Sequence, residues 1–267
     1  MEIKNQIFFV TGGCSGLGLA VTYELLELHG LVCVLDRDEE QGNNLEKKHD
    51  GRLLFQKADV RSELEIHTGI KKAIETWPER TIGGLVHCAG IGAGGKVVGS
   101  RGQAGSLEIF KSVIDINLTG SFNVARLVAS EIVSQSLPIN NSKTGQKAKD
   151  DQGVIILTSS TSYQDGQVGQ VGYAASKGGV ASMILPMARD LARFGIRVNA
   201  IAPSLFDTKM GKSVSPAVKE NLLKTLEYPL RFGDPREFSS LVVECIRNTY
   251  LNGTVIRLDA AGRMGKI

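Results

Sequence analysis

A tyrosine and a lysine stand four residues apart, at positions 173 and 177, in a segment with helical periodicity. Residues four apart on a helix share one face, so the Tyr173 phenol and the Lys177 ammonium should lie close together. A nearby ammonium stabilises phenolate and lowers the pKa of a tyrosine, which then exchanges protons with an alcohol or carbonyl near neutral pH. This pair is therefore our candidate for general acid–base chemistry.

Two further polar residues are candidates for the same site. Ser160 follows an apolar run at 154–158, and a hydroxyl at the carboxyl end of a strand can polarise a carbonyl or stabilise an alkoxide. Asn117 lies among apolar neighbours in a long helical segment. Two interpretations of Asn117 stay open: a polar residue bonded to a backbone carbonyl, or a kinked helical turn that holds a water in a proton relay to Lys177.

The glycines point to a second kind of chemistry. Glycine accounts for 31 of the 267 residues, and Gly12, Gly16 and Gly18 form a turn between an apolar strand and a helix. Glycine lets the backbone approach a pyrophosphate closely, and the N-terminus of the following helix presents free N–H groups to the anion. An ordinary turn is the alternative, but the strand before and the helix after favour a dinucleotide site.

Acidic and small residues extend this candidate site. Asp36 closes the second strand, where a carboxylate accepts hydrogen bonds from ribose hydroxyls and repels a 2′-phosphate, so NAD is favoured over NADP. Two observations weigh against this interpretation of Asp36. Arg37 follows it directly and could accommodate a 2′-phosphate, and Asp36 could simply be a solvated residue at the end of a strand. Open α/β sheets bind ligands at the carboxyl ends of their strands. Further residues that follow strands in this way are Asp59, Val60, Cys88, Ala89 and Gly90.

The elements that must position these residues alternate along the chain. Strand-like runs occur at 6–11, 31–35, 53–58, 84–88, 154–158, 196–201 and 254–258. Helical patterns occur at 17–29, 38–48, 62–76, 107–135, 173–193, near 216–226 and at 235–248. Alternation of this kind predicts βαβ units with right-handed crossovers. We expect one α/β domain over residues 1–267, a Rossmann-type doubly wound parallel sheet of about seven strands flanked by helices, with an exposed insertion near 136–152.

Composition excludes several other classes of protein. The net charge of +3 is too small to indicate a nucleic-acid partner, and no apolar run reaches the roughly 18 residues that a membrane span needs. The four histidines show no metal-ligand spacing, so we expect no metal site. The four cysteines form no CxxC pair and are interpreted as reduced thiols. The first residues lack the features of a signal peptide, which favours the cytoplasm.

Together these motifs resemble a known family. TGGCSGLG at 11–18, Asp36, Asp-Val at 59–60, CAG at 88–90, Asn117, Ser160 and YAASK at 173–177 occur in the order found in short-chain dehydrogenase/reductases. The resemblance covers essentially the whole chain. Four longer strings are similar to the type II 3-hydroxyacyl-CoA dehydrogenases, mitochondrial enzymes that also oxidise hydroxysteroids: GQVGQVGYAASKGG, ARDLARFGIRV, IAPSLFDT and YLNGTVIRLD.

The resemblance implies hydride transfer between NAD and a secondary alcohol or ketone, with a 3-hydroxyacyl-CoA or a hydroxysteroid as the expected substrate. Tyr173 would be the general acid/base, Lys177 would bind the nicotinamide ribose, Ser160 would orient the substrate oxygen and Asn117 would support the relay. Gln170 would face the substrate beside Ser160 and Tyr173. The implied cofactor contacts are Gly12, Ser15, Gly16, Leu17, Gly18, Asp36, Asp59, Val60, Cys88, Ala89, Gly90, Tyr173, Lys177, Pro203, Phe206 and Thr208.

Departures from the family pattern concern the substrate. His87 replaces the asparagine usual before CAG, and Ser204 replaces the glycine expected after Pro203. Asp207 would favour a smaller or more polar substrate than a fatty acyl thioester, and Tyr163 would narrow the pocket. One alternative is therefore a dehydrogenase of another alcohol or ketone in specialised metabolism. The other alternative is a non-catalytic scaffold or RNA-processing subunit, which is a second role known for animal members of this subgroup.

The resemblance also bears on assembly and compartment. The helices expected at 107–135 and 173–193 are those that pack across a two-fold axis in tetramers of the family, so a homo-oligomer, a tetramer or dimer, is expected. Val255, Ile256 and Leu258 would suit a further interface or ordinary core packing. The partners we expect are a small-molecule substrate and other copies of the chain, with no membrane and no nucleic acid. The resemblance implies the mitochondrial matrix as the alternative to the cytoplasm.

Overall fold

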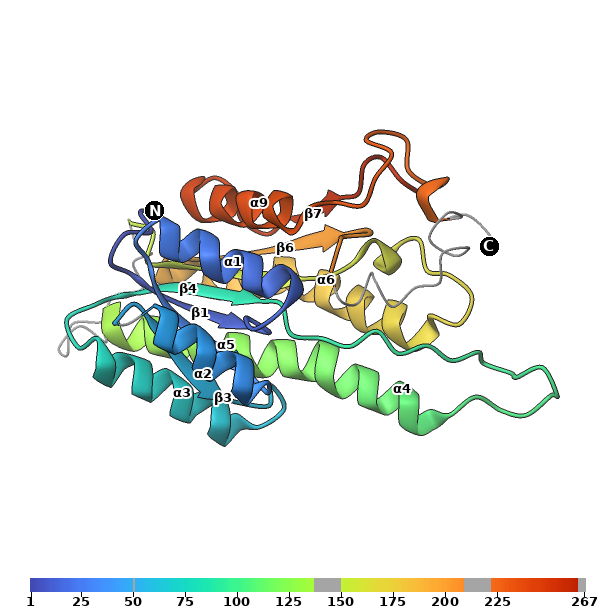
Figure 1. Ribbon diagram of the computed structural model, residues 1–267, viewed down its shortest axis with the longest axis horizontal. Helices are drawn as coiled ribbons and strands as arrows, with labels where there is room; N and C mark the ends of the chain where they lie inside the picture. The colour runs from blue at the N-terminus through green and yellow to red at the C-terminus, as the bar shows by residue number, and fades with distance from the viewer. Residues whose placement is uncertain (50, 137–149, 209–221, 264–267) are drawn as a thin grey trace.

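Seven parallel strands form one sheet in the order β3-β2-β1-β4-β5-β6-β7 (Figure 1). The structure, a computed structural model, describes residues 1–49, 51–136, 150–208 and 222–263. The strands are β1 Ile7–Thr11, β2 Leu31–Asp36, β3 Leu53–Lys57, β4 Ile82–His87, β5 Gly153–Thr158, β6 Ile196–Pro203 and β7 Val255–Leu258. The predicted α/β class, the doubly wound parallel sheet and its seven strands are confirmed.

The central strands are buried on both faces, which explains why they read as continuous apolar runs rather than as alternating ones. The chain winds outward from β1 to β3 and then returns to add β4 on the other side of β1. At this reversal the last residues of two strands, Thr11 and His87, are paired neighbours. A crevice opens at such a switch point, outside the carboxyl ends of the strands.

Helices cover both faces of the sheet. On one face lie α1 Gly16–Glu27, α2 Glu39–Lys48 and α9 Pro235–Arg247, and Figure 1 shows α1 and α9 side by side there. The other face carries α3 Glu63–Thr76, α5 Gly120–Ser136 and α6 Val171–Leu191, with α4 Leu107–Ile114 packed against α6. Each layer buries its own apolar cluster, so the sheet is sandwiched between two cores.

The helix expected over 107–135 is interrupted, which corrects the prediction. α4 ends at Ile114, a π-helical turn η1 spans Asp115–Thr119, and α5 begins at Gly120. A π turn holds one residue more than an α turn and is common at functional sites. Here the turn contains the fully buried Asn117, so the irregularity coincides with a candidate site residue.

Some predictions fall outside the described part of the chain. The insertion expected near 136–152 lies mostly on residues 137–149, and the short helix near 216–226 lies mostly on residues 209–221. The extent of a single domain over the whole chain also stays a prediction. No helix within the described ranges is long and apolar enough to cross a membrane. All four cysteines are free thiols.

Candidate active site

The turn that follows β1 can be built only from glycine at two positions. Gly12 has φ = +66°, and a Cβ there would lie 2.9 Å from the Ala89 backbone nitrogen. A Cβ on Gly18 would lie 2.2 Å from the carbonyl oxygen of Gly12. Real Cβ atoms do not approach backbone this closely, so the turn is pressed between the start of α1 and the end of β4. Its backbone is therefore free of side chains where a ligand would approach.

The N-terminus of α1 is open to an anion. Ser15 occupies the N-cap position, but its side chain makes no capping hydrogen bond, and the first turn of α1 contains no acidic residue. The unpaired N–H groups of a helix start carry a partial positive charge that favours phosphate. A diphosphate fits this position, as the glycine spacing predicts.

Asp36 presents a carboxylate whose orientation is fixed by the backbone. One carboxylate oxygen, Oδ2, accepts a hydrogen bond from the Cys14 backbone N–H at 3.0 Å. The other, Oδ1, accepts from the Asp38 N–H at 3.1 Å. Each oxygen of a carboxylate can accept more than one bond, so Asp36 can still receive a pair of ribose hydroxyls.

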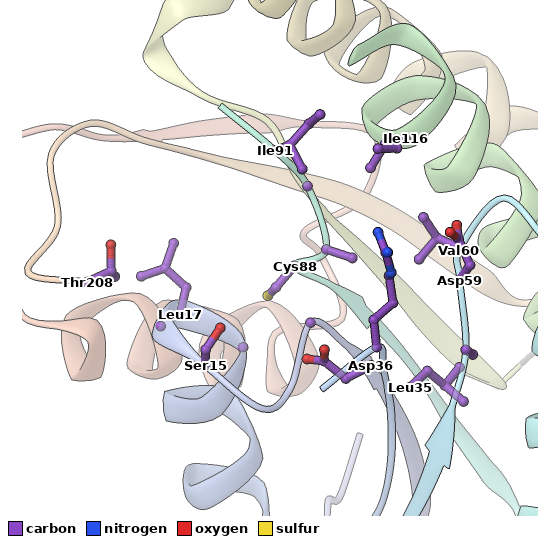
Figure 2. Close-up of a pocket in the computed structure, with 17 residues that line it drawn as sticks. Ser15, Leu17, Leu35, Asp36, Asp59, Val60, Cys88, Ile91, Ile116 and Thr208 are labelled. Atoms are coloured by element: carbon purple, nitrogen blue, oxygen red, sulfur yellow. The ribbon is translucent and has the colours of Figure 1, made fainter. Parts of the chain in front are cut away.

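These residues line one cavity of about 300 Å³ at the switch point of the sheet (Figure 2). The predicted cofactor residues that it brings together are Gly12, Ser15, Gly16, Leu17, Gly18, Asp36, Asp59, Val60, Cys88, Ala89, Gly90 and Thr208. Five lining residues were missed: Leu35, Arg37, Ala58, Ile91 and Ile116. Each is the immediate sequence neighbour of a predicted site residue, so that adjacency could have identified them.

A second cavity, of about 410 Å³, adjoins the first. It brings together the predicted residues Ser160, Gln170, Tyr173, Lys177, Pro203 and Phe206. The two cavities share a wall made of Leu17, Cys88, Gly90, Ile91 and Thr208. They therefore form one cleft, with the glycine turn at one end and the tyrosine–lysine pair at the other.

Three side chains meet in the second cavity. The Ser160 side chain lies close enough to the Tyr173 hydroxyl to influence its pKa. The Nζ atom of Lys177 lies 5.9 Å from the centre of the Tyr173 ring and donates a hydrogen bond to the Thr158 carbonyl oxygen at 2.7 Å. The predicted helical spacing thus places Tyr173 and Lys177 on one face of α6, and the end of β5 supplies Ser160.

Burial has the largest effect on the pKa values of Tyr173 and Lys177. It raises the pKa of Tyr173, and the side chain of Ser160 opposes the rise. Lys177 is not among the groups that shift the pKa of Tyr173, so the lowering by Lys177 stays a prediction. Burial also lowers the pKa of Lys177, to about 8, with Cys88 acting weakly in the opposite direction.

Asn117 acts on the cleft through the backbone. Its Oδ1 accepts a hydrogen bond from the Ile91 N–H at 2.8 Å, and its Nδ2 donates to the Ile91 carbonyl at 2.9 Å. Nδ2 also donates to the Ser176 hydroxyl at 3.2 Å. The first interpretation, a polar residue bonded to backbone, is confirmed. A water relay from Asn117 to Lys177 stays a prediction.

The structure shows where His87, Asp207 and Tyr163 lie. His87 is buried, and its Nδ1 lies 2.9 Å from the Thr11 hydroxyl. Burial, and then Lys177, lower the pKa of His87 to about 3, so the ring is neutral at physiological pH. Asp207 and Tyr163 are not among the residues that line the second cavity. The roles expected of Asp207 and Tyr163 toward the substrate stay predictions, and Asp207 lines grooves beside α9.

The two halves of the cleft suit a dinucleotide and a small substrate. The glycine cradle, the open helix start and the oriented carboxylate fit a diphosphate and a ribose with free hydroxyls. Over the described ranges, no cluster of three or more His, Cys, Asp or Glu side chains is positioned to hold a metal ion. The chemistry available from these side chains is proton transfer and hydrogen bonding to a carbonyl or alcohol.

Comparisons with known proteins agree with this geometry. A family model described as short chain dehydrogenase matches residues 6–219. The 3-hydroxyacyl-CoA dehydrogenase type-2 of Bos taurus is 42% identical over 264 residues, which cover 98% of this chain and 97% of that protein. The ipsdienol dehydrogenase of Ips pini is 32% identical over 270 residues, covering 98% of this chain and 99% of that one.

A solved structure is similar over the same extent. The crystal structure of 3-hydroxyacyl-CoA dehydrogenase type-2 from Mycobacterium avium superposes with a TM-score of 0.89. It is 32% identical in sequence and covers 98% of both chains. The similarity therefore includes both the glycine-turn half and the tyrosine–lysine half of the cleft.

Proposed function

This chain belongs to the short-chain dehydrogenase family, and we propose that it is an NAD-dependent 3-hydroxyacyl-CoA dehydrogenase. As a member of the family it is an oxidoreductase that interconverts a secondary alcohol and a ketone. The observation that carries the proposal is the single cleft that joins the glycine turn to Ser160, Tyr173 and Lys177. The acyl-CoA substrate is supported by the identity of 42% with the bovine enzyme.

NAD(H) is the cofactor that these residues favour. The N–H groups at the start of α1 would hold the diphosphate, and Asp36 would hold the adenosine ribose. A carboxylate fixed at this place repels the 2′-phosphate that distinguishes NADP. When bound, the nicotinamide supplies or accepts the hydride.

Tyr173 and Ser160 handle the substrate oxygen. In the reduction direction the Tyr173 hydroxyl donates its proton to the ketone oxygen, and the Ser160 hydroxyl donates a hydrogen bond to the same oxygen. In the oxidation direction Tyr173 must first lose its proton, and the resulting phenolate then takes the proton from the alcohol. Burial keeps Tyr173 in its neutral, proton-donating form, which suits the reduction.

Lys177 and Asn117 support this chemistry indirectly. Lys177 carries its proton below pH of about 8, and its ammonium is anchored on the Thr158 carbonyl. It would bind the nicotinamide ribose and restore the proton of Tyr173. Asn117 is a positioning residue, because it holds the backbone of Ile91 in the wall that both cavities share.

Substrate identity is tested with a panel assayed under one set of conditions. The purified chain is given NADH with acetoacetyl-CoA, a ketosteroid and small ketones, and NADH oxidation is followed by absorbance. We expect the highest kcat/KM with acetoacetyl-CoA. Absence of any turnover of acetoacetyl-CoA would contradict the proposed substrate class while leaving the family assignment intact.

A second candidate function follows from one relative. Ipsdienol dehydrogenase is named for an alcohol that is not a thioester, and it is 32% identical over nearly the full length. Another alcohol or ketone of specialised metabolism would be supported if a small ketone or terpenoid ketone exceeded acetoacetyl-CoA in the same panel.

Replacing Asp36 with alanine is expected to weaken NADH binding by about tenfold to a hundredfold and to improve NADPH binding. A hydrogen bond to a charged group contributes about 1.5–3 kcal/mol, and each 1.4 kcal/mol is a factor of about ten in affinity. Loss of the carboxylate also removes repulsion of the 2′-phosphate. Fluorescence titration with NADH and NADPH measures both dissociation constants.

The matched control is Asp190→Ala, which removes an exposed carboxylate on α6. It should bind both cofactors as the unmodified chain does. An Asp36→Ala variant whose preference for NADH is unchanged would show that Asp36 does not select the cofactor.

Assembly and compartment complete the proposal. Exposed apolar side chains gather on α4, α5 and α6, namely Leu107, Ile109, Phe110, Phe122, Val171 and Leu185. Burial of such side chains between copies of the chain supports a homo-oligomer, a dimer or tetramer. Sedimentation analysis would measure the mass of this oligomer. The choice between the cytoplasm and the mitochondrial matrix stays a prediction that cell fractionation addresses.

A further inference from the structure

An ion-pair cluster outside the two cavities centres on Arg257 in β7. Its guanidinium Nε donates to Asp259 Oδ2 at 2.7 Å, and Nη1 donates to Gln164 Oε1 at 2.9 Å. Nη2 donates to both the Asp165 carboxylate and the Gly262 carbonyl. The side chains of Arg257, Asp165 and Asp259 are only 15%, 16% and 11% exposed. Arginine is suited to such a place, because its rigid fork of N–H donors can reach several acceptors at once.

Two of these acceptors belong to the turn that carries Ser160. The Tyr163 N–H donates to the Ser160 carbonyl at 3.0 Å, and the Asp165 N–H donates to the Thr161 carbonyl at 2.9 Å. The Ser160 hydroxyl itself accepts from the Ser162 N–H at 3.2 Å. The chain from 160 to 165 is therefore one compact turn, and Arg257 holds its far end.

The strand of Arg257 also supports the part of the second cavity that follows β6. Ala202 pairs with Arg257 and Pro203 pairs with Leu258 in the sheet. The Ser204 N–H donates to the Leu258 carbonyl at 3.1 Å. Pro203 and Ser204, like Ser160, line the cavity. Arg257 thus joins the wall that carries Ser160 to the wall that follows β6.

The segment after β7 has a strained backbone, and the ion-pair cluster is bonded to both ends of the strained residues. Ala260 and Ala261 have φ of +50° and +56°, a region that non-glycine residues adopt only when their surroundings enforce it. Asp259 and Gly262 lie on either side of this pair, and both accept hydrogen bonds from Arg257. The cluster therefore holds the segment in its unusual conformation.

We propose that Arg257 is a positioning residue that sets the separation between the Ser160 turn and the wall after β6, and so places the substrate oxygen against Tyr173. The inference rests on the proposed function, because it assigns Arg257 to the orientation of the substrate of that site. It makes no use of the glycine-turn half of the cleft. Arg257 should therefore affect substrate turnover much more than the affinity for NADH, whose diphosphate and adenosine ribose would lie in the glycine-turn half.

The test compares Arg257→Gln and Arg257→Lys with the unmodified chain. We expect Arg257→Gln to lower kcat/KM for acetoacetyl-CoA by about tenfold to a hundredfold, since a displacement of about 1 Å can have an effect of that size. The dissociation constant for NADH should change much less than kcat/KM, because Arg257 forms hydrogen bonds with none of the residues that line the first cavity. Arg257→Lys should recover only part of the loss, because one ammonium cannot replace the four hydrogen bonds.

Asp165→Asn is a milder variant that can be used if Arg257→Gln folds poorly. It should also lower kcat/KM for acetoacetyl-CoA, but by a smaller factor. The matched control is Arg236→Gln, which removes an ion pair whose arginine is 83% exposed. It should behave as the unmodified chain. Equal kcat/KM for Arg257→Gln and the unmodified chain would overturn the inference, as would a parallel loss of NADH affinity.

Hydrogen exchange decides the inference without any turnover. In Arg257→Gln the amides of 161–167 should exchange faster, and those of 7–18 should exchange as in the unmodified chain. A local positioning role would be refuted if exchange became faster throughout the chain. It would also be refuted if exchange at 161–167 did not change. If the unmodified chain turns over no acetoacetyl-CoA, the proposed function fails, and the exchange comparison still decides the role of Arg257.

Discussion

Replacing Tyr173 with phenylalanine is expected to lower kcat/KM for the ketone by about 10²- to 10⁴-fold, the usual contribution of a general acid. The substitution removes only the hydroxyl, and the ring keeps its packing beside Lys177. The proton donor and the neighbour of the Ser160 side chain are lost together. Initial rates with NADH and acetoacetyl-CoA, together with NADH titration, measure the effect, and NADH affinity should change by less than about threefold.

Tyr250→Phe is the matched control, because the Tyr250 side chain is 98% exposed and the same atom is removed. It should retain full activity. If Tyr173→Phe kept the rate of the unmodified chain, the proton would have to come from another group. If the variant were inactive in the assay but fully replaced the protein in cells, the scaffold alternative would become the main function.

Gly18→Ala is expected to weaken NADH binding by about tenfold to a hundredfold. The added Cβ would lie 2.2 Å from the Gly12 carbonyl oxygen and 2.7 Å from its carbon. Neither atom belongs to a side chain that could rotate away, so the turn itself must move. Overpacking of this kind costs about 1–3 kcal/mol, and 1.4 kcal/mol corresponds to a factor of about ten in affinity. Fluorescence titration and thermal unfolding of the same samples separate loss of binding from loss of stability.

Gly178→Ala is the control for this substitution. Nothing lies within 4 Å of a Cβ built on Gly178, which is inside α6. This variant should bind NADH as the unmodified chain does, and alanine should favour the helix slightly. Unchanged NADH affinity in Gly18→Ala would mean that the turn accommodates the added methyl group without displacing the groups that bind NADH.

The sheet and most of the site could be predicted from sequence for a common physical reason. Parallel strands buried on both faces leave long apolar runs, and the residues that follow each run must gather at one edge of the sheet. Asp36, Cys88 and Ser160 come together because each directly follows such a run. Tyr173 and Lys177 face the same edge because helical spacing places them on one side of α6.

What escaped prediction depends on contacts between distant segments. The π turn leaves no mark in the pattern of apolar residues, which continues through Asp115–Thr119, because it is stabilised by Asn117 and its bonds to Ile91. The pKa of Tyr173 is set by burial, which spacing along a helix does not reveal. Asp207 lies beside predicted site residues in sequence, but in the structure it lines grooves that residues of α9 also line.

The extra residue of the π turn also sets the rotational phase of the helices that flank it. One residue corresponds to about 100° around a helix axis, so each side chain after the turn faces a direction about 100° away from the one that an unbroken α-helix would give it. On the two sides of this change of direction, α4 packs against α6 and α5 packs against β4.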